Sequence, residues 1–443
     1  MRPEANAPSR ASASQRESLV RAIGTLGLAA GIINITIGGG IFRLPAMVAT
    51  SLGPAAPIAY LVCAVAMGLI VLCIADAGSR VALTGGPYVY VGTAFGSYVG
   101  FLSGVLLWMI GTFATAAVGT VFATNVGLLI PPLSSRGGSI AMLFATFAFW
   151  SLVNLRGVML GARLNTIVTV AKLLPLLLLA VGGAFFIQGD NLRIAEMPAA
   201  AEVARTSLFL VFAFAGIEVA LVPSGEVRDI ARTVPRATAL AMIGITVLYI
   251  SLQVVAQGIL GIGLAQAAAS PLADAAGASL GGWARAVLLA GAAISMFGYI
   301  GGVTLSVPRM LFALARDGFL PRALAAVHPV HRSPQAAILV QSTLAFALAI
   351  SGTFEKLAIL ANVSALALYF GCALAAWRLR QLGVAEQGVA SRVPLGAVAP
   401  WLACVVIVWL LTGLTGGEWL AFGACLAAAS LLYAATRTVR QGT

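Results

Sequence analysis

The chain has 443 residues, of which 60% are hydrophobic and only 9% are charged, and its mean hydropathy is +1.01. This composition excludes an ordinary soluble protein, so we expect a polytopic membrane protein without a soluble catalytic or DNA-binding domain. The net charge of +12 indicates orientation rather than a nucleic acid partner, because most arginines fall in loops and tails on one side of the predicted topology. This bias predicts an even number of spans with both termini in the cytoplasm.

Apolar segments long enough to cross a bilayer recur along the chain. We predict twelve transmembrane helices, at 22–49, 54–79, 92–128, 138–155, 161–187, 204–230, 236–258, 282–314, 334–352, 355–379, 395–414 and 417–436. The polar residues 1–20 are expected to form a disordered cytoplasmic tail rather than a signal peptide. Residues 437–443 are expected to form a second cytoplasmic tail.

The first span contains the sequence IINITIGGGIFRLP, which runs from Ile32 to Pro45. Three adjacent glycines and a proline are poor helix formers, so the pattern predicts a helix that is interrupted inside the membrane. Unwound backbone survives there only against protein or beside a cavity. Taken alone, the glycine triplet favours a helix-packing surface, and only a second interruption at the position that an inverted repeat requires reverses this preference.

A second interruption is predicted in the sixth span, at Phe214, Ala215 and Gly216. The two interrupted spans are five helices apart, and an odd number of helices reverses the direction of the chain. The spacing therefore predicts an inverted repeat, with one unit at 21–190, a second at 203–380, and two further helices at 392–436.

Interrupted helices expose amide groups with partial positive charge at one end and carbonyl groups with partial negative charge at the other. Such ends can hold a zwitterion, and glycines allow a carboxylate to approach the amides closely. We expect carbonyls at Ile37, Phe212, Ala213 and Ala215 to accept hydrogen bonds from an ammonium group. A site of this kind recognises the main chain of an amino acid.

Four segments resemble motifs of the amino acid–polyamine–organocation transporter superfamily. GIINITIGGGIFRLP is similar to its first-helix motif, and VFAFAGIEVALVPSGEVRDIARTVPRA to its sixth-helix segment. TGGPYVYVGTAFGSYVGFLSG resembles the link between its second and third helices, and SVPRMLFALARDGFLP its eighth-helix exit. The resemblance covers roughly residues 20 to 380 in the same order.

The resemblance implies an all-α, leucine-transporter-like fold with five plus five inverted helices, broken helices one and six, and two more helices. It also implies that the substrate carboxylate meets amides at Gly39, Gly40 and Ile41, and that Phe214 closes over the pocket. The substrate-binding residues are then Ile37, Gly38, Gly39, Gly40, Ile41, Phe212, Ala213, Phe214, Ala215 and Gly216. The middle position of the first break is often serine or threonine in the family, whereas Gly39 offers no hydroxyl.

Two charged residues inside spans are candidates for coupling. Lys172 lies in the middle of the fifth span, where an ammonium group is costly. In some members of the family a lysine at this position takes the place of sodium. It either carries a proton, or serves as a fixed charge that permits exchange. Glu218 follows the sixth-helix break and either pairs with a proton or a cationic substrate, or caps free backbone amides.

Arg43 lies just outside the first break, where an outer gate would close. We take Glu355, at the outer start of the tenth span, as its candidate partner, with snorkelling to the interface as the alternative. Near the cytoplasmic side, Asp76 beside Arg80 and Glu226 beside Arg228 are expected to form interfacial ion pairs or an inner gate.

No enzyme, metal site or cofactor is expected. Both histidines, His328 and His331, lie in one loop without further ligands, and the five cysteines lie in apolar runs as small buried residues. We therefore predict a sodium-independent amino acid permease of the inner (plasma) membrane, driven by protons or by exchange. The alternatives are a non-transporting amino acid sensor and a cationic amino acid or polyamine exchanger. An apolar pocket favours neutral or branched substrates.

Overall fold

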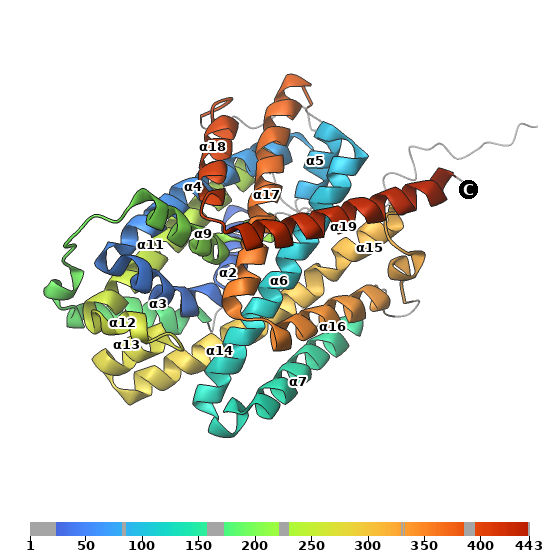
Figure 1. The fold of residues 1–443 in the computed structure, drawn as a ribbon. Helices are drawn as coiled ribbons and strands as arrows, with labels where there is room; N and C mark the ends of the chain where they lie inside the picture. Colours follow the sequence, from blue (N-terminus) through green and yellow to red (C-terminus); the bar gives the residue numbers. More distant parts are fainter. Residues whose placement is uncertain are drawn as a thin grey trace, which may run out of the picture.

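The computed structural model describes residues 24–81, 86–156, 172–220, 230–328, 331, 333–384 and 395–441. Within these residues the regular structure is helical and no strand occurs (Figure 1). The α-helices are α2 (Thr25–Thr36), α3 (Gly40–Leu52), α4 (Ala56–Arg80), α5 (Pro87–Phe95), α6 (Ser97–Leu129), α7 (Arg136–Leu155), α9 (Ala200–Phe214), α10 (Ile217–Ala220), α11 (Ile230–Leu260), α12 (Gly263–Gln266), α13 (Pro271–Leu280), α14 (Gly282–Ser306), α15 (Pro308–Arg316), α16 (Gln335–Ser351), α17 (Phe354–Gln381), α18 (Ala399–Leu411) and α19 (Gly416–Gln441). A further apolar helix covers Lys172–Phe186, and 3-10 turns occur at Gly53–Ala55, Pro131–Ser134, Gly183–Phe186, Gly189–Leu192 and Arg322–Ala325.

Seven helical stretches of the described residues are long and apolar enough to cross a membrane, and three shorter apolar helices accompany them. Large apolar side chains such as Leu61, Ile243 and Leu420 point outward and are more than half exposed. Lys172 and Glu218, in contrast, are buried inside the bundle. This inside-out polarity is the arrangement that a lipid environment requires, and it confirms the predicted polytopic membrane protein.

Helix boundaries depart from the predicted spans where glycine or proline interrupts the chain. The predicted span 92–128 is divided at Gly96, whose φ of +89° is in the left-handed region that favours glycine. The predicted span 282–314 is likewise divided before Pro308, where α14 ends and α15 begins. Apolar composition alone does not reveal such interruptions, because both halves of each span remain hydrophobic.

Helix α19 continues to Gln441, past the predicted end of the last span at residue 436. The whole predicted N-terminal tail, residues 1–20, and the first part of the predicted span 161–187 lie outside the described residues.

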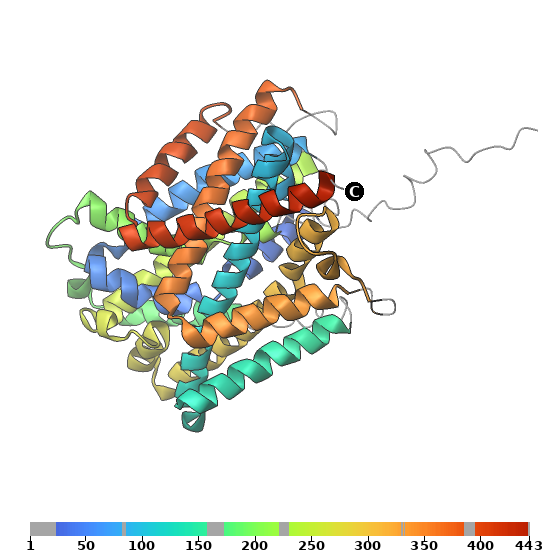
Figure 2. The same cartoon turned by 45° about the vertical axis from the view of Figure 1, so that its right-hand side comes forward.

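The long helix α6 runs through the centre of the bundle, where it packs against α14, α16 and α17. Figure 2 shows α19 crossing the outside of the bundle, and most of its large apolar side chains are exposed. Beside the centre, α3 packs against α9 and α2 packs against α10. Helices α2 and α3 form one consecutive pair, and α9 and α10 form another. Because the first helix of each pair contacts the second helix of the other pair, the two pairs run antiparallel.

Candidate functional site

Both predicted interruptions are present. The first helix pair breaks between Thr36, the last residue of α2, and Gly40, the first residue of α3. The second breaks between Phe214, the last residue of α9, and Ile217, the first residue of α10. Because the two pairs are antiparallel neighbours, their unwound segments meet near the middle of the bundle.

The glycines at the breaks allow the backbones to approach closely. A Cβ added at Gly40 would lie 3.0 Å from Cδ1 of Phe212 and 3.3 Å from the Cα of Ala213. Gly216 has a φ of +120°, and a Cβ there would lie 3.0 Å from the side chain of Ile35. A side chain at either position would force its neighbours to shift, and Gly216 also needs glycine for its backbone conformation.

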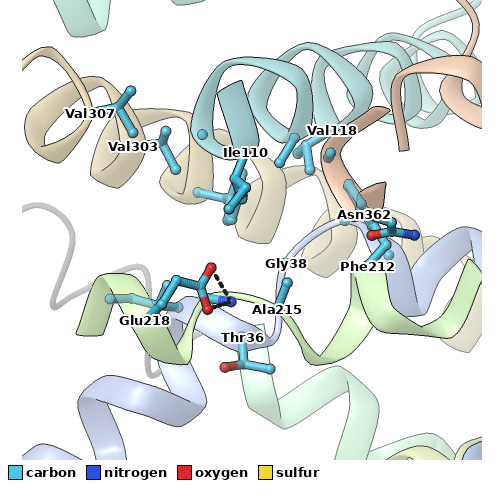
Figure 3. A pocket seen from close by; sticks show the side chains of 18 residues that line it. Thr36, Gly38, Ile110, Val118, Phe212, Ala215, Glu218, Val303, Val307 and Asn362 are labelled. Carbon is cyan, nitrogen blue, oxygen red and sulfur yellow. Dashed lines mark hydrogen bonds between the residues drawn. The ribbon is translucent and has the colours of Figure 1, made fainter. Parts of the chain in front are cut away.

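The two breaks face one small cavity (Figure 3). Its open space is about 30 Å³, which holds about two water molecules. An amino acid therefore enters only when the walls move apart. The cavity is lined by Ile35, Thr36, Gly38, Gly39, Gly40, Ile110, Gly111, Ala114, Val118, Phe212, Ala215, Gly216, Glu218, Tyr299, Val303, Val307, Ala361 and Asn362.

Backbone amides are free on one side of this cavity. Gly40 and Ile41 begin the 13-residue helix α3, so their amides have no acceptor within that helix. The amide of Gly39 has no backbone acceptor among the described residues. These three groups carry the partial positive charge of a helix N-terminus, the environment that a carboxylate prefers.

Backbone carbonyls are free on the other side. The amide of Gly216 donates to both carboxylate oxygens of Glu218, at 3.1 Å and 3.0 Å, and not to the carbonyl of Phe212 four residues earlier. Within the described residues, the carbonyl of Phe212 therefore lacks its helical donor. The carbonyl of Ala213 accepts from the hydroxyl of Tyr249 at 3.1 Å and retains a second lone pair.

Lys172 contacts the first break. Its ammonium nitrogen donates to the carbonyl oxygen of Ile37 at 2.8 Å, and the side chain is buried. The carbonyl of Ile37 was expected to face the substrate, but it is turned to Lys172, and Ile37 does not line the cavity.

Glu218 links the second break to α17 through hydrogen bonds to both. Besides accepting from the amide of Gly216, its Oε2 accepts from the hydroxyl of Tyr369 at 2.7 Å. Both residues are buried. The capping role considered for Glu218 is therefore observed, since its carboxylate satisfies a backbone amide left free by the break.

Two ion pairs link helices that are distant in sequence. Arg43 on α3 pairs with Glu355 on α17, Nη2 to Oε1, at 3.5 Å, which confirms the candidate partner, and it also donates to the carbonyl of Ala268. Asp76, on α4, pairs with Arg80 at 3.2 Å and with Arg380 on α17 at 2.7 Å. Glu226 and Arg228 lie outside the described residues.

The structure separates the predicted binding residues into two groups. Gly38, Gly39, Gly40, Phe212, Ala215 and Gly216 line the cavity, whereas Ile37, Ile41, Ala213 and Phe214 do not. The ring of Phe214 is fully buried against Tyr249, with centroids 5.3 Å apart, so Phe212 is the phenylalanine at the cavity. Tyr299 on α14, for which core packing was the default expectation and the pocket the alternative, lines the cavity. The lining residues of α6 and α17 were missed, although Asn362 could have been found as an uncharged polar residue inside a span.

Comparison with known proteins agrees with this geometry. The family model for amino acid permeases matches residues 23–414. The chain therefore belongs to the amino acid permease family and is an integral membrane transporter rather than an enzyme.

Relatives across this family share most of their length with the chain. It is 26% identical over 436 residues to a methylthioribose transporter, covering 95% of this chain and 94% of that protein. It is 29% identical over 408 residues to a serine/threonine exchanger, with 88% and 90% covered. It is 24% identical over 420 residues to a branched-chain amino acid permease, with 91% and 90% covered. All three are from Bacillus subtilis, and their names differ in substrate.

Proposed function

We propose that the protein is a secondary active transporter that moves amino acids across the plasma membrane by alternating access. The observation that carries this proposal is the pair of broken helices with opposite peptide poles at one cavity. The substrate carboxylate binds the amides of Gly39, Gly40 and Ile41. Its ammonium group binds the carbonyls of Phe212 and Ala215, which line the cavity, and the carbonyl of Ala213 becomes accessible to it when the walls move apart.

The proposed architecture is twelve helices with two inverted repeats of five. This architecture is supported by contacts between helices that occupy the same position in the two five-helix units. Helix α4 packs against α11, α6 against α14, and α7 against α16, in addition to the antiparallel broken pairs. Such contacts are expected when two halves are related by a pseudo-two-fold axis.

A repeated local feature supports the same architecture. Helix α5 begins at Pro87 and ends before Gly96, which has φ +89° and ψ 178° and leads directly into α6. Helix α13 begins at Pro271 and ends before Gly281, which has φ +93° and ψ 176° and leads directly into α14. In Figure 1 these two short helices lie at opposite ends of the bundle, as inversion requires. Both termini are proposed to be cytoplasmic.

The proposed coupling is independent of sodium, because the Lys172 ammonium group supplies a positive charge beside the first break. With this charge in place, transport proceeds either by exchange of internal and external substrate or with a proton. The relative named as an exchanger supports exchange as the first mode to test.

The proposed function is tested by uptake of labelled amino acids into proteoliposomes. Uptake is measured with and without unlabelled amino acid inside, with and without a pH gradient, and with sodium replaced by choline. We expect saturable uptake that is unaffected by sodium removal and is stimulated by internal substrate or by a pH gradient. Absence of both binding and uptake for every amino acid would refute the proposal.

A further inference from the structure

Asn362 on α17 is a buried polar residue at the cavity with half of its hydrogen-bonding capacity unused. It is 1% exposed. Its Nδ2 donates to the carbonyl of Leu208 at 2.7 Å, which fixes the orientation of the amide. Its Oδ1 has no hydrogen-bond partner among the residues that the structure describes. Figure 3 shows this oxygen on the side of the cavity and the nitrogen turned away.

An acceptor buried without a donor is unfavourable, because folding removes its water without replacing it. The side chains of Ile110, Val118, Phe212 and Ala361 in the same wall are apolar, and among the described residues neither the amides of Gly39 and Gly40 nor the hydroxyl groups of Thr36 and Tyr299 at the cavity donate to this oxygen. A donor carried by the ligand would satisfy the oxygen.

The acceptor also lies away from the position proposed for the ligand main chain. Leu208, which holds the amide of Asn362, is one helical turn before Phe212, and a turn is about 5.4 Å along the axis. Asn362 is therefore held about one turn along α9 from the carbonyls that receive the ammonium group. This displacement suits a group on the ligand side chain.

On these grounds we infer that Asn362 is a specificity-determining residue that selects an amino acid with a hydroxyl group on its side chain. This inference rests on the proposed function. A second ammonium group is disfavoured there, because the nearest carboxylate at the cavity, Glu218, is already engaged with Gly216 and Tyr369, and a charge without a counter-ion is costly to bury.

Threonine and valine provide the sharpest test, because they have nearly the same shape and differ by one hydroxyl group. The ratio of their kcat/KM values for uptake does not depend on the amount of active protein, because a loss of active protein lowers both values by the same factor. We expect the wild-type protein to prefer threonine by roughly ten- to a hundredfold, the effect of one buried hydrogen bond. Equal uptake of the two, or preference for valine, would overturn the inference without affecting the proposed function.

The variant Asn362→Leu removes the acceptor and is expected to bring the ratio to about one, with valine uptake retained. Asn362→Ser keeps an uncharged oxygen acceptor and is expected to keep part of the preference for threonine, so it also serves if the leucine variant does not fold. The matched control is Asn125→Leu, because Asn125 is buried on α6, does not line the cavity, and bonds only within its helix. A uniform loss for both amino acids in Asn362→Leu, or loss of the preference in the control, would contradict a role in specificity.

Discussion

The ammonium group of Lys172 donates a hydrogen bond to the carbonyl oxygen of Ile37 over 2.8 Å, although the two residues are 135 positions apart. The contact joins the fifth predicted span to the unwound part of the first. The ammonium group donates to a carbonyl that has no helical donor because of the break. This hydrogen bond offsets part of the cost of burying a cation inside the helix bundle.

The first prediction concerns this contact. In Lys172→Met the carbonyl of Ile37 loses its charged hydrogen-bond donor. A hydrogen bond to a charged group contributes about 1.5–3 kcal/mol to the stability of the folded state. We expect the apparent affinity for substrate to fall at least about tenfold, measured as KM in proteoliposomes. Lys172→Arg is not expected to restore it, because the planar guanidinium is larger than the space around a fully buried lysine. Full activity of Lys172→Met would contradict a supporting role for this charge at the first break.

The second prediction concerns the contact between Gly39 and α6. A Cβ at Gly39 would lie 3.0 Å from Cγ2 of Val118, so Gly39→Ala should displace the first break and weaken substrate binding. Val118→Ala removes the obstructing methyl groups. We expect the double variant to bind more tightly than Gly39→Ala alone, as a double-mutant cycle would measure. Strict additivity would show that the two positions are not in contact during binding.

The third prediction concerns backbone conformation at the second break. Gly216→Ala places a side chain at φ +120°, which costs about 1–3 kcal/mol, and it also brings Cβ against Ile35. We expect a clear fall in the thermal unfolding temperature in detergent. Gly423→Ala, in the interior of α19 with no atom within 4 Å of the new Cβ, should leave it unchanged or raise it slightly. Equal effects of the two changes would argue against strain at Gly216.

The fourth prediction concerns the outer ion pair. Arg43 and Glu355 are both partly exposed, at 23% and 41%, and their closest distance is 3.5 Å, so the pair contributes little to stability. Glu355→Gln should therefore leave the unfolding temperature almost unchanged while it increases access to the cavity from outside. The rate of thiol labelling of a cysteine introduced at Val118 measures this access. An unchanged labelling rate would remove Glu355 from the gate.

The fifth prediction concerns the opposite ion pair. The carboxylate of Asp76 is buried and accepts from both Arg80 and Arg380. Asp76→Asn leaves two partly buried guanidinium groups without a counter-ion, which is strongly destabilising. A marked fall in unfolding temperature is expected. Asp190→Asn is the control, because Asp190 and its partner Arg193 are 85% and 83% exposed, and no change is expected there.

Local sequence was sufficient to predict the breaks and the charged residues. Glycine triplets and intramembrane charges are rare and costly, so their positions in the sequence are informative in themselves. The pairing of Arg43 with Glu355 could be proposed because both positions fall at the same predicted depth.

The cavity wall could not be predicted in the same way. Which face of α6 or α17 points inward depends on packing, and nearly every residue of these spans is apolar on all sides. Phe214 was therefore expected at the cavity where Phe212 lies. Tyr369 and Arg380 were not anticipated as partners of Glu218 and Asp76, since each pair joins helices far apart in sequence.

The central claim is that opposite peptide poles hold a zwitterion between the two breaks. It is tested most directly by competition for binding among the transported amino acid, its decarboxylated amine and its deaminated acid. If both poles are needed, each analogue should bind at least about tenfold more weakly than the amino acid, because each lacks one set of charge-assisted hydrogen bonds. An analogue that competes as well as the amino acid would show that one pole does not take part, and would contradict the claim.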